Sequence, residues 1–159
     1  MNAQAKPLSD WIGSSELRED VITLAPALGV SALLDREEPL PEMGSPLPAL
    51  WHWFYFLPQV RNSRIGVDGH PQRGGFLPPV ELPRRMFAGS RMDFIAPLII
   101  GAPARREGTV LSVTEKSGKS GKLVFVTVEY RIYQNEILCI REEQDIVYKE
   151  AGGRVSPPV

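Results

Sequence analysis

The C-terminal third of the chain contains the run LVFVTVEYRIYQNEILCIREEQDIVY, from Leu123 to Tyr148. This run is rich in β-branched and aromatic residues, which favour β-strands. In its first half apolar residues recur at every second position, so one face of a strand carries Val124, Val126, Val128, Tyr130 and Ile132. The turn residues Gln134-Asn135-Glu136 predict a short hairpin connection between the strands Leu123–Tyr133 and Ile137–Tyr148.

Two shorter segments upstream, Arg91–Ile95 and Gly108–Val113, predict further strands, and Ser117–Gly121 predicts a polar turn. Together these segments predict an antiparallel meander of four or five strands. The second face of the strand Leu123–Tyr133 mixes apolar and charged residues. We therefore expect a helix or a partner to cover that face in part.

The N-terminal region has apolar residues at spacings of three and four between Leu17 and Ala32, which is typical of one helix face. A proline and a glycine interrupt this stripe, so it predicts a short helix over Ser15–Ile22 and a second over Pro26–Asp35. The aromatic run Trp51–Phe56 predicts another strand. The predicted fold class is α+β, with a strongly curved antiparallel sheet wrapped around a helix. The uncovered edge and face of this sheet predict dimerisation.

Length and composition limit the possible classes of protein. A chain of 159 residues with 43% apolar residues suits one domain, which we place at residues 11–150, between a flexible N-terminus (1–10) and a disordered tail (151–159). Lys and Arg total 18 against 19 Asp and Glu, so the chain lacks the positive charge typical of nucleic-acid-binding proteins. The sequence contains no apolar run long enough for a signal peptide or a membrane span, and we expect a cytoplasmic protein.

The single cysteine, Cys139, excludes a disulfide within the chain, and with two histidines the usual structural zinc sites cannot be assembled. The sequence therefore predicts no metal site. We expect Cys139 to pack in a strand as a small apolar residue.

The middle of the chain is rich in proline, with nine of the 15 prolines between Pro39 and Pro83, which excludes long regular helices there. The run Gly66–Pro79 predicts a long ordered loop. Since mobility alone would not require apolar residues such as Phe76 in this loop, we expect the loop to have a function.

Several runs resemble the N-terminal half of the mesaconyl-CoA (methylfumaryl-CoA) hydratases, in the MaoC-like dehydratase group. The resemblance covers roughly Trp11 to Glu150 and rests on blocks that follow the order of the family. These blocks are LWHWFYFLP (50–58), DGHPQRGGFLPP (68–79), LPRRMFAG (82–89), FIAPL (94–98), KSGKSGKLVFVTV (116–128) and EEQDIVY (142–148).

The resemblance implies a hot-dog fold, an acyl-CoA thioester as substrate, and reversible addition of water to a double bond conjugated to the thioester. No separate cofactor is implied, because CoA is part of the substrate. Members of the family typically have two tandem hot dogs, and the catalytic Asp and His lie in the second, within a Gly-Asp-x-Asn-Pro-x-His block that has no match here. We therefore expect a hydratase or dehydratase subunit that works with a separately encoded catalytic hot-dog partner.

Two alternatives remain open at this stage. In the first, the chain forms a homodimer whose own Asp68 and His70 are catalytic, since a carboxylate and an imidazole together supply the base and the acid that enoyl hydration needs. The same two residues also fit a structural role in which they hold the loop by hydrogen bonds. In the second alternative, the chain is a non-catalytic acyl-CoA-binding or regulatory protein. His52, between two tryptophans, is expected to be a satisfied and partly buried histidine.

The segment from Arg61 to Arg91 contains six arginines, no lysine and two acidic residues. The planar guanidinium suits phosphate oxygens, and glycines let backbone N–H groups approach a pyrophosphate, so this segment is predicted to bind CoA. The alternative is that the arginines pair with acidic residues elsewhere, notably Glu142, Glu143 and Asp145. The predicted substrate-binding residues are Trp53, Arg73, Gly74, Gly75, Phe76, Arg84 and Arg85.

Overall fold

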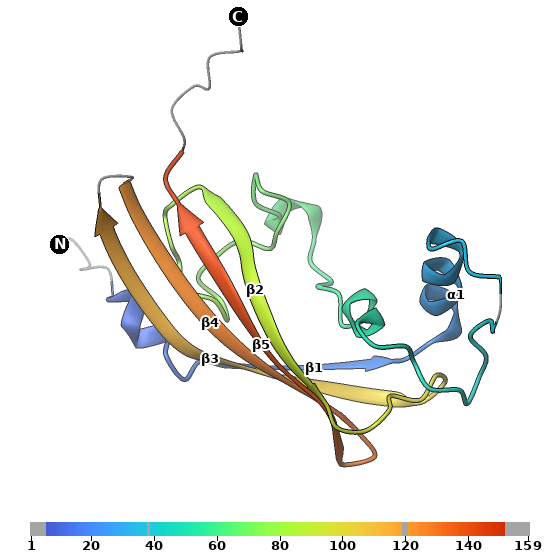
Figure 1. Ribbon diagram of the computed structural model, residues 1–159. Coiled ribbons are helices and arrows are strands. Elements are labelled where there is room, and N and C mark those ends of the chain that lie inside the picture. Colours follow the sequence, from blue (N-terminus) through green and yellow to red (C-terminus); the bar gives the residue numbers. More distant parts are fainter. Residues whose placement is uncertain (1–5, 38, 119–120, 152–159) are drawn as a thin grey trace, which may run out of the picture.

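The computed structural model describes residues 6–37, 39–118 and 121–151 and consists of one curved antiparallel sheet and one α-helix (Figure 1). The sheet has the strand order β1-β3-β4-β5-β2. The predicted α+β class and the curved antiparallel sheet are confirmed. The strands are β1 (Ser15–Val21), β2 (Arg84–Phe94), β3 (Pro103–Gly118), β4 (Gly121–Gln134) and β5 (Ile137–Lys149), the helix is α1 (Leu24–Leu33), and the 3-10 turns are η1 (Leu8–Trp11), η2 (Trp51–Phe54) and η3 (Asn62–Arg64).

Strands β3, β4 and β5 form the predicted meander. The β4–β5 turn is tight because Asn135 and Glu136 both adopt left-handed backbone angles, with φ of 49° and 61°. Two consecutive residues with positive φ match the right-handed twist of the flanking strands. On β4, Val124, Val126, Val128 and Ile132 are all buried, which confirms the face that the alternation predicts.

The predicted helix over Ser15–Ile22 is wrong, because these residues form strand β1 at one edge of the sheet. Strand β1 pairs with β3, and its side chains alternate between exposed and half-buried. The apolar residues at spacings of three and four belong to two different elements, because the first of them lie in β1 and the others in α1. Within β1 itself, Leu17 is 60% exposed, so it contributes no apolar stripe to the core.

The predicted strand over Trp51–Phe56 is also wrong, because the run begins with the 3-10 turn η2. Leu50 and Phe56 adopt left-handed backbone angles, with φ of 71° and 56°, on either side of this turn. A strand cannot pass through residues in that conformation. The second predicted helix is confirmed as α1, with Pro26 in its first turn, where its missing N–H needs no partner.

The buried apolar residues form two clusters. The first joins α1 and η2 to one end of the sheet, through residues such as Ala27, Val30, Trp51 and Cys139. The second lies farther along the sheet, where Val80 from the segment before β2 packs against the valines of β4. Figure 1 shows α1 beside one end of the curved sheet.

The predicted terminal segments are described only in part. Of the ten N-terminal residues, Lys6–Asp10 are described; Leu8 begins η1 and packs against the second apolar cluster. The tail, residues 151–159, lies outside the described residues except for Ala151. No described helix has the length and apolar character needed to cross a membrane.

Gly108 on β3 allows the loop before β2 to pack directly on the sheet. A Cβ at this position would lie 3.0 Å from both Phe76 Cζ and Tyr130 Cε1. We predict that Gly108→Ala lowers the free energy of unfolding by about 1–3 kcal/mol, because the aromatic rings must move apart. Urea unfolding measures this change.

The matched control is Gly89→Ala on β2, since a Cβ there has no neighbour within 4 Å. Equal stability losses in the two variants would contradict the close packing of Phe76 on Gly108.

Candidate functional site

A cavity of about 530 Å³ lies between the sheet and the segment that leads from η2 to β2. All five strands contribute side chains to it. The strand residues are Glu16, Arg18, Arg85, Arg106, Tyr130, Gln144 and Tyr148, and the segment before β2 adds Trp53, Tyr55, Phe56, Leu57, Pro58, His70, Pro71, Gln72, Arg73, Gly75, Phe76 and Leu77.

Two of the arginines in this cavity share one carboxylate. Glu16 accepts hydrogen bonds from Arg18 Nε and Nη2, at 3.1 and 3.0 Å, and from Arg106 Nη2, at 3.3 Å. The Arg106 guanidinium also lies over the rings of Phe56 and Tyr130, with its central carbon 5.5 and 4.6 Å from the ring centroids. Two guanidinium groups against one carboxylate give this end of the cavity a net positive charge.

Arg73 ties the ends of the loop together. Its Nη1 donates to the carbonyl oxygens of Val80 and Leu82, and its Nη2 donates to that of Pro83 and to Asp68 Oδ2, the last at 3.1 Å. Because both terminal nitrogens are engaged by the protein, the structure gives Arg73 a role in holding the loop. Its predicted contact with substrate stays a prediction.

Asp68 and His70 lie close together in the same loop. The His70 amide donates to Asp68 Oδ1 at 3.2 Å, and His70 Nδ1 lies 3.1 Å from the Asp68 carbonyl oxygen. Burial acts to raise the pKa of the Asp68 carboxyl, but the hydrogen bonds from the His70 amide and the Arg73 side chain lower it overall. This arrangement fits the loop-holding interpretation, and His70 lines the cavity while Asp68 does not. A catalytic role for the pair stays a prediction.

Arg84 and Arg85 do not form a paired site, because neighbouring residues of a strand point to opposite faces. Arg85 faces the cavity beside its cross-strand partner Tyr148, whereas Arg84 is exposed and pairs in register with Lys149. Of the other predicted binding residues, Trp53, Gly75 and Phe76 line the cavity and Gly74 does not. The Gly75 carbonyl accepts a hydrogen bond from Trp11 Nε1 at 3.2 Å.

A bulge in β2 determines which face each arginine of this strand occupies. The register with β5 shifts between Phe87 and Gly89, so the strand has one extra residue there. This insertion reverses the alternation. Arg85 consequently faces the cavity, while Arg91 points to the outer face.

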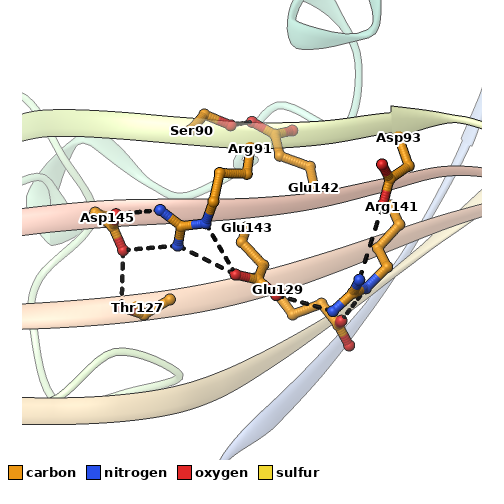
Figure 2. Close-up of polar contacts among 9 residues, drawn as sticks. All are labelled: Ser90, Arg91, Asp93, Thr127, Glu129, Arg141, Glu142, Glu143 and Asp145. Carbon is orange, nitrogen blue, oxygen red and sulfur yellow. Dashed lines mark hydrogen bonds and ion pairs between the residues drawn. The ribbon is translucent and has the colours of Figure 1, made fainter.

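On the outer face, Arg91 pairs with Asp145 at 2.7 Å and with Glu143 at 3.1 Å, as Figure 2 shows. Arg141 pairs in turn with Glu129 and Glu143, at 2.6 and 2.8 Å. For Arg91 the structural interpretation is thus confirmed, and the six arginines do not act as one cluster.

Among the residues that the structure describes, Glu142 is the most buried carboxylate, and the sequence predicted for it only an ion pair with an arginine. Glu142 and His52 are each 2% exposed, with His52 Nε2 3.1 Å from Glu142 Oε2. The carboxylate also accepts hydrogen bonds from Trp53 Nε1, Ser90 Oγ and Gln144 Nε2, at 3.0, 2.9 and 2.8 Å. His52 is therefore fully buried and not partly buried as predicted, and its Nδ1 has no partner among the described residues.

Burial acts to raise the pKa of the Glu142 carboxyl, but the hydrogen bonds from His52, Gln144 and Ser90 lower it overall. The signal in the sequence was the period of two, since Glu142 shares a strand face with Ile140 and Ile146. The same signal marks Tyr148 on the cavity face. No sequence pattern identified Arg18 or Arg106.

Comparison with known proteins gives a family match. The model of the family described as hydroxyacyl-thioester dehydratase type 2 matches residues 50–158. The mesaconyl-C(4)-CoA hydratase of Chloroflexus aurantiacus is 59% identical over 148 residues, which are 93% of this chain and 53% of that protein. The chain thus spans about half the length of this relative.

Solved structures with low sequence identity share the fold. The HadBC (3R-hydroxyacyl-ACP dehydratase) complex of Mycobacterium tuberculosis has a TM-score of 0.61 at 11% identity, covering 89% of this chain and 99% of that chain. The ChsH1-ChsH2 complex of the same organism has a TM-score of 0.60 at 12% identity, covering 89% and 85%. The (R)-hydratase of A. caviae has a TM-score of 0.51 at 19% identity, covering 92% and 99%. The expected hot-dog fold is confirmed.

Glu142 links stability to pH. Since its pKa is lowered in the folded protein, its contribution is present above the ordinary glutamate pKa of about 4.3 and is lost as the pH falls through the folded-state pKa. We predict that Glu142→Gln costs about 3–5 kcal/mol at pH 7, because His52 and Trp53 lose a charged acceptor. We also predict that the free energy of unfolding of the Glu142→Gln protein falls less steeply than that of the wild type between pH 6 and pH 3. Urea midpoints across this range measure both effects.

The control is Glu143→Gln on the neighbouring outer face, where exposed ion pairs contribute at most about 1 kcal/mol. A Glu142→Gln protein with the pH profile of the wild type would show that the buried carboxylate does not carry this dependence.

Proposed function

Because the chain belongs to the hydroxyacyl-thioester dehydratase type 2 family, we propose that it is the substrate-binding part of an acyl-CoA hydratase. The proposed reaction adds water to, or removes it from, the double bond of an enoyl-CoA thioester similar to mesaconyl-CoA. A second hot-dog unit supplies the catalytic Asp and His. No further cofactor is proposed, because CoA is part of the substrate.

One observation carries this proposal. The chain is 59% identical to a mesaconyl-C(4)-CoA hydratase over almost its whole length, yet it spans only about half of that protein. The remaining length of the relative has room for another unit of similar size. The proposed substrate and reaction are those in the name of this relative, and they belong to the relative's full-length protein.

The chemistry of the cavity supports a binding role. Hydration of an enoyl thioester needs a base, an acid and donors for the enolate oxygen. Among the cavity side chains that the structure describes, Glu16 is the one carboxylate, and two arginines already hold it. The cavity offers cations, aromatic rings and hydroxyl groups, which bind and orient a substrate.

The surface beside β2 is the proposed contact with the second unit. Strand β2 is an edge strand, and its apolar side chains are unusually exposed, with Phe87 at 60% and the following Ile95 at 57%. Exposed edges and apolar patches mark surfaces that pair with other chains. The partner is either a catalytic hot dog or a second copy of this chain.

A non-catalytic acyl-CoA-binding protein is the second candidate function. The observation that favours it is the loop geometry, since the carboxylate of Asp68 is held by the His70 amide and Arg73. A protein of this kind would bind the thioester without a catalytic partner.

Measuring turnover of enoyl-CoA thioesters distinguishes the divided hydratase from the non-catalytic binding protein. We predict that the purified chain alone does not hydrate mesaconyl-CoA or crotonyl-CoA, and that activity appears when the unmatched half of the Chloroflexus relative is added as a separate protein. Loss of the absorbance of the conjugated thioester measures the reaction.

Turnover by the chain alone would contradict the divided enzyme, and its loss in Asp68→Asn would then favour the homodimer. Thioester binding with no turnover in the mixture would favour the non-catalytic protein.

The β2 surface gives a separate prediction. Phe87→Arg should prevent association, either with a second copy or with the added half, because a charge replaces an apolar side chain at the proposed interface. Sedimentation velocity measures the change in mass. Leu33→Arg on α1 is the control, since Leu33 is 75% exposed at a different surface, and it should associate like the wild type. Association that is unchanged in Phe87→Arg would remove β2 from the interface.

A further inference from the structure

The side-chain amide of Gln144 on β5 is held in one orientation. Gln144 lines the cavity, and its Nε2 donates a hydrogen bond of 2.8 Å to Glu142 Oε1. The hydrogen bonds around Glu142 lower the pKa of its carboxyl, and an ionised carboxylate accepts hydrogen bonds but donates none. Only the NH2 end of the amide can therefore face Glu142, so the carbonyl end of the amide is turned away from it.

The carbonyl oxygen of this amide, Gln144 Oε1, accepts no hydrogen bond from any residue that the structure describes. It is also not enclosed by the protein. In the described part of the chain, the buried side-chain atoms without a partner belong to Ser31, His52, Arg106 and Tyr148. Since Gln144 lines the cavity, its carbonyl oxygen is open to a ligand there.

This oxygen lies among groups of the opposite kind. The guanidinium groups of Arg18, Arg85 and Arg106 line the same cavity and can only donate hydrogen bonds, and Glu16 already accepts from two of them. An open acceptor in such a cavity selects a ligand group that carries a proton. Carboxylates and pyrophosphates have no proton to donate at neutral pH, whereas hydroxyl groups and amide N–H groups do.

A CoA thioester has donors of both kinds. The acyl chain carries a hydroxyl group once water has been added to its double bond, and the pantetheine arm of CoA carries amide N–H groups. A site built to bond a ligand's O–H or N–H discriminates against a ligand that lacks it, because the polar group of the site is then left without a partner.

We propose that the Gln144 side-chain carbonyl accepts a hydrogen bond from an O–H or N–H group of the bound thioester, and that Glu142 fixes this preference by holding the amide in one orientation. This inference rests on the proposed function and adds a binding residue to it. With the hydroxyl group as donor, Gln144 distinguishes the hydrated thioester from the unsaturated one.

The test uses titration calorimetry on the purified chain with three ligands. 3-Hydroxybutyryl-CoA and butyryl-CoA differ only in the hydroxyl group, and CoA alone is the third ligand. Gln144→Met keeps the length of the side chain and removes its carbonyl. This variant should bind every ligand that carries the donor about threefold to tenfold more weakly, as expected for the loss of one hydrogen bond.

The pattern of losses identifies the donor. If the donor is the hydroxyl group, the wild type binds 3-hydroxybutyryl-CoA more tightly than butyryl-CoA, and Gln144→Met removes this difference. If the donor is a pantetheine amide, the wild type binds the two thioesters equally, and Gln144→Met weakens the binding of both and of CoA to the same extent. Either pattern supports the inference.

Ser90→Ala is the matched control. Ser90 is the cross-strand neighbour of Gln144, and its Oγ also donates to Glu142 Oε1, at 2.9 Å, but Ser90 does not line the cavity. Both variants thus remove one donor from the same carboxylate, and both should lower the urea midpoint of unfolding. Only Gln144→Met should change the affinity for the thioesters.

Two results would overturn the inference. Wild-type affinity of the Gln144→Met protein for all three ligands would show that the carbonyl bonds no ligand group. Equal weakening in Ser90→Ala would assign the effect to the surroundings of Glu142. In both cases thioester binding by the wild type remains, whereas a wild type that binds none of the three ligands would overturn the proposed function as well.

Discussion

The buried carboxylate of Glu142 connects three parts of the protein that are distant in sequence. It lies on β5 and accepts hydrogen bonds from Trp53 of η2, Ser90 of β2 and Gln144, and His52 Nε2 lies 3.1 Å from its Oε2. An ionised carboxylate is stable in such a place only when it has several donors. These donors must therefore stay close to the carboxylate, and this holds η2 and β2 against β5. The wall of the cavity that Trp53 forms is a consequence.

The bulge in β2 separates two kinds of arginine that look alike in the sequence. Before the bulge, Arg85 faces the cavity; after it, Arg91 faces outward and meets the carboxylates of Glu143 and Asp145. One extra residue thus places one arginine inside the cavity, without an ion pair to any described residue, and another on the outer face, where carboxylates pair with it. The charge of the segment as a whole predicted an anion-binding region, but only the register of the strand shows which arginine faces the cavity.

Much of the fold was predictable because β3, β4 and β5 lie at the centre of the sheet, where one buried face imposes a period of two on the sequence. The edge strand β1 escaped prediction because its half-buried side chains, such as Arg18, are polar while Leu17 is exposed, so its burial alternates without an apolar face. The run at η2 escaped because aromatic residues bury equally well in a turn. For the site, the resemblance led to the loop that lines the cavity, where Trp53, Gly75, Phe76, Arg73, His70 and Arg85 all lie. Arg106 was missed because only the pairing of β3 with β1 and β4 brings it to the cavity, whereas the face of Tyr148 could be read from the period of two in β5.

The cavity itself follows from the shortness of the helix. Ten residues make α1 about 15 Å long, whereas the 14 residues of β4 extend over about 46 Å. One such helix covers only part of the sheet, and the irregular segment between Leu34 and Pro83 must cover the rest. Irregular backbone needs hydrogen-bond partners that a helix supplies internally, and Arg73 provides them for Val80, Leu82 and Pro83. The cavity lies between this cover and the sheet, and Arg73 both lines the cavity and holds the end of the loop.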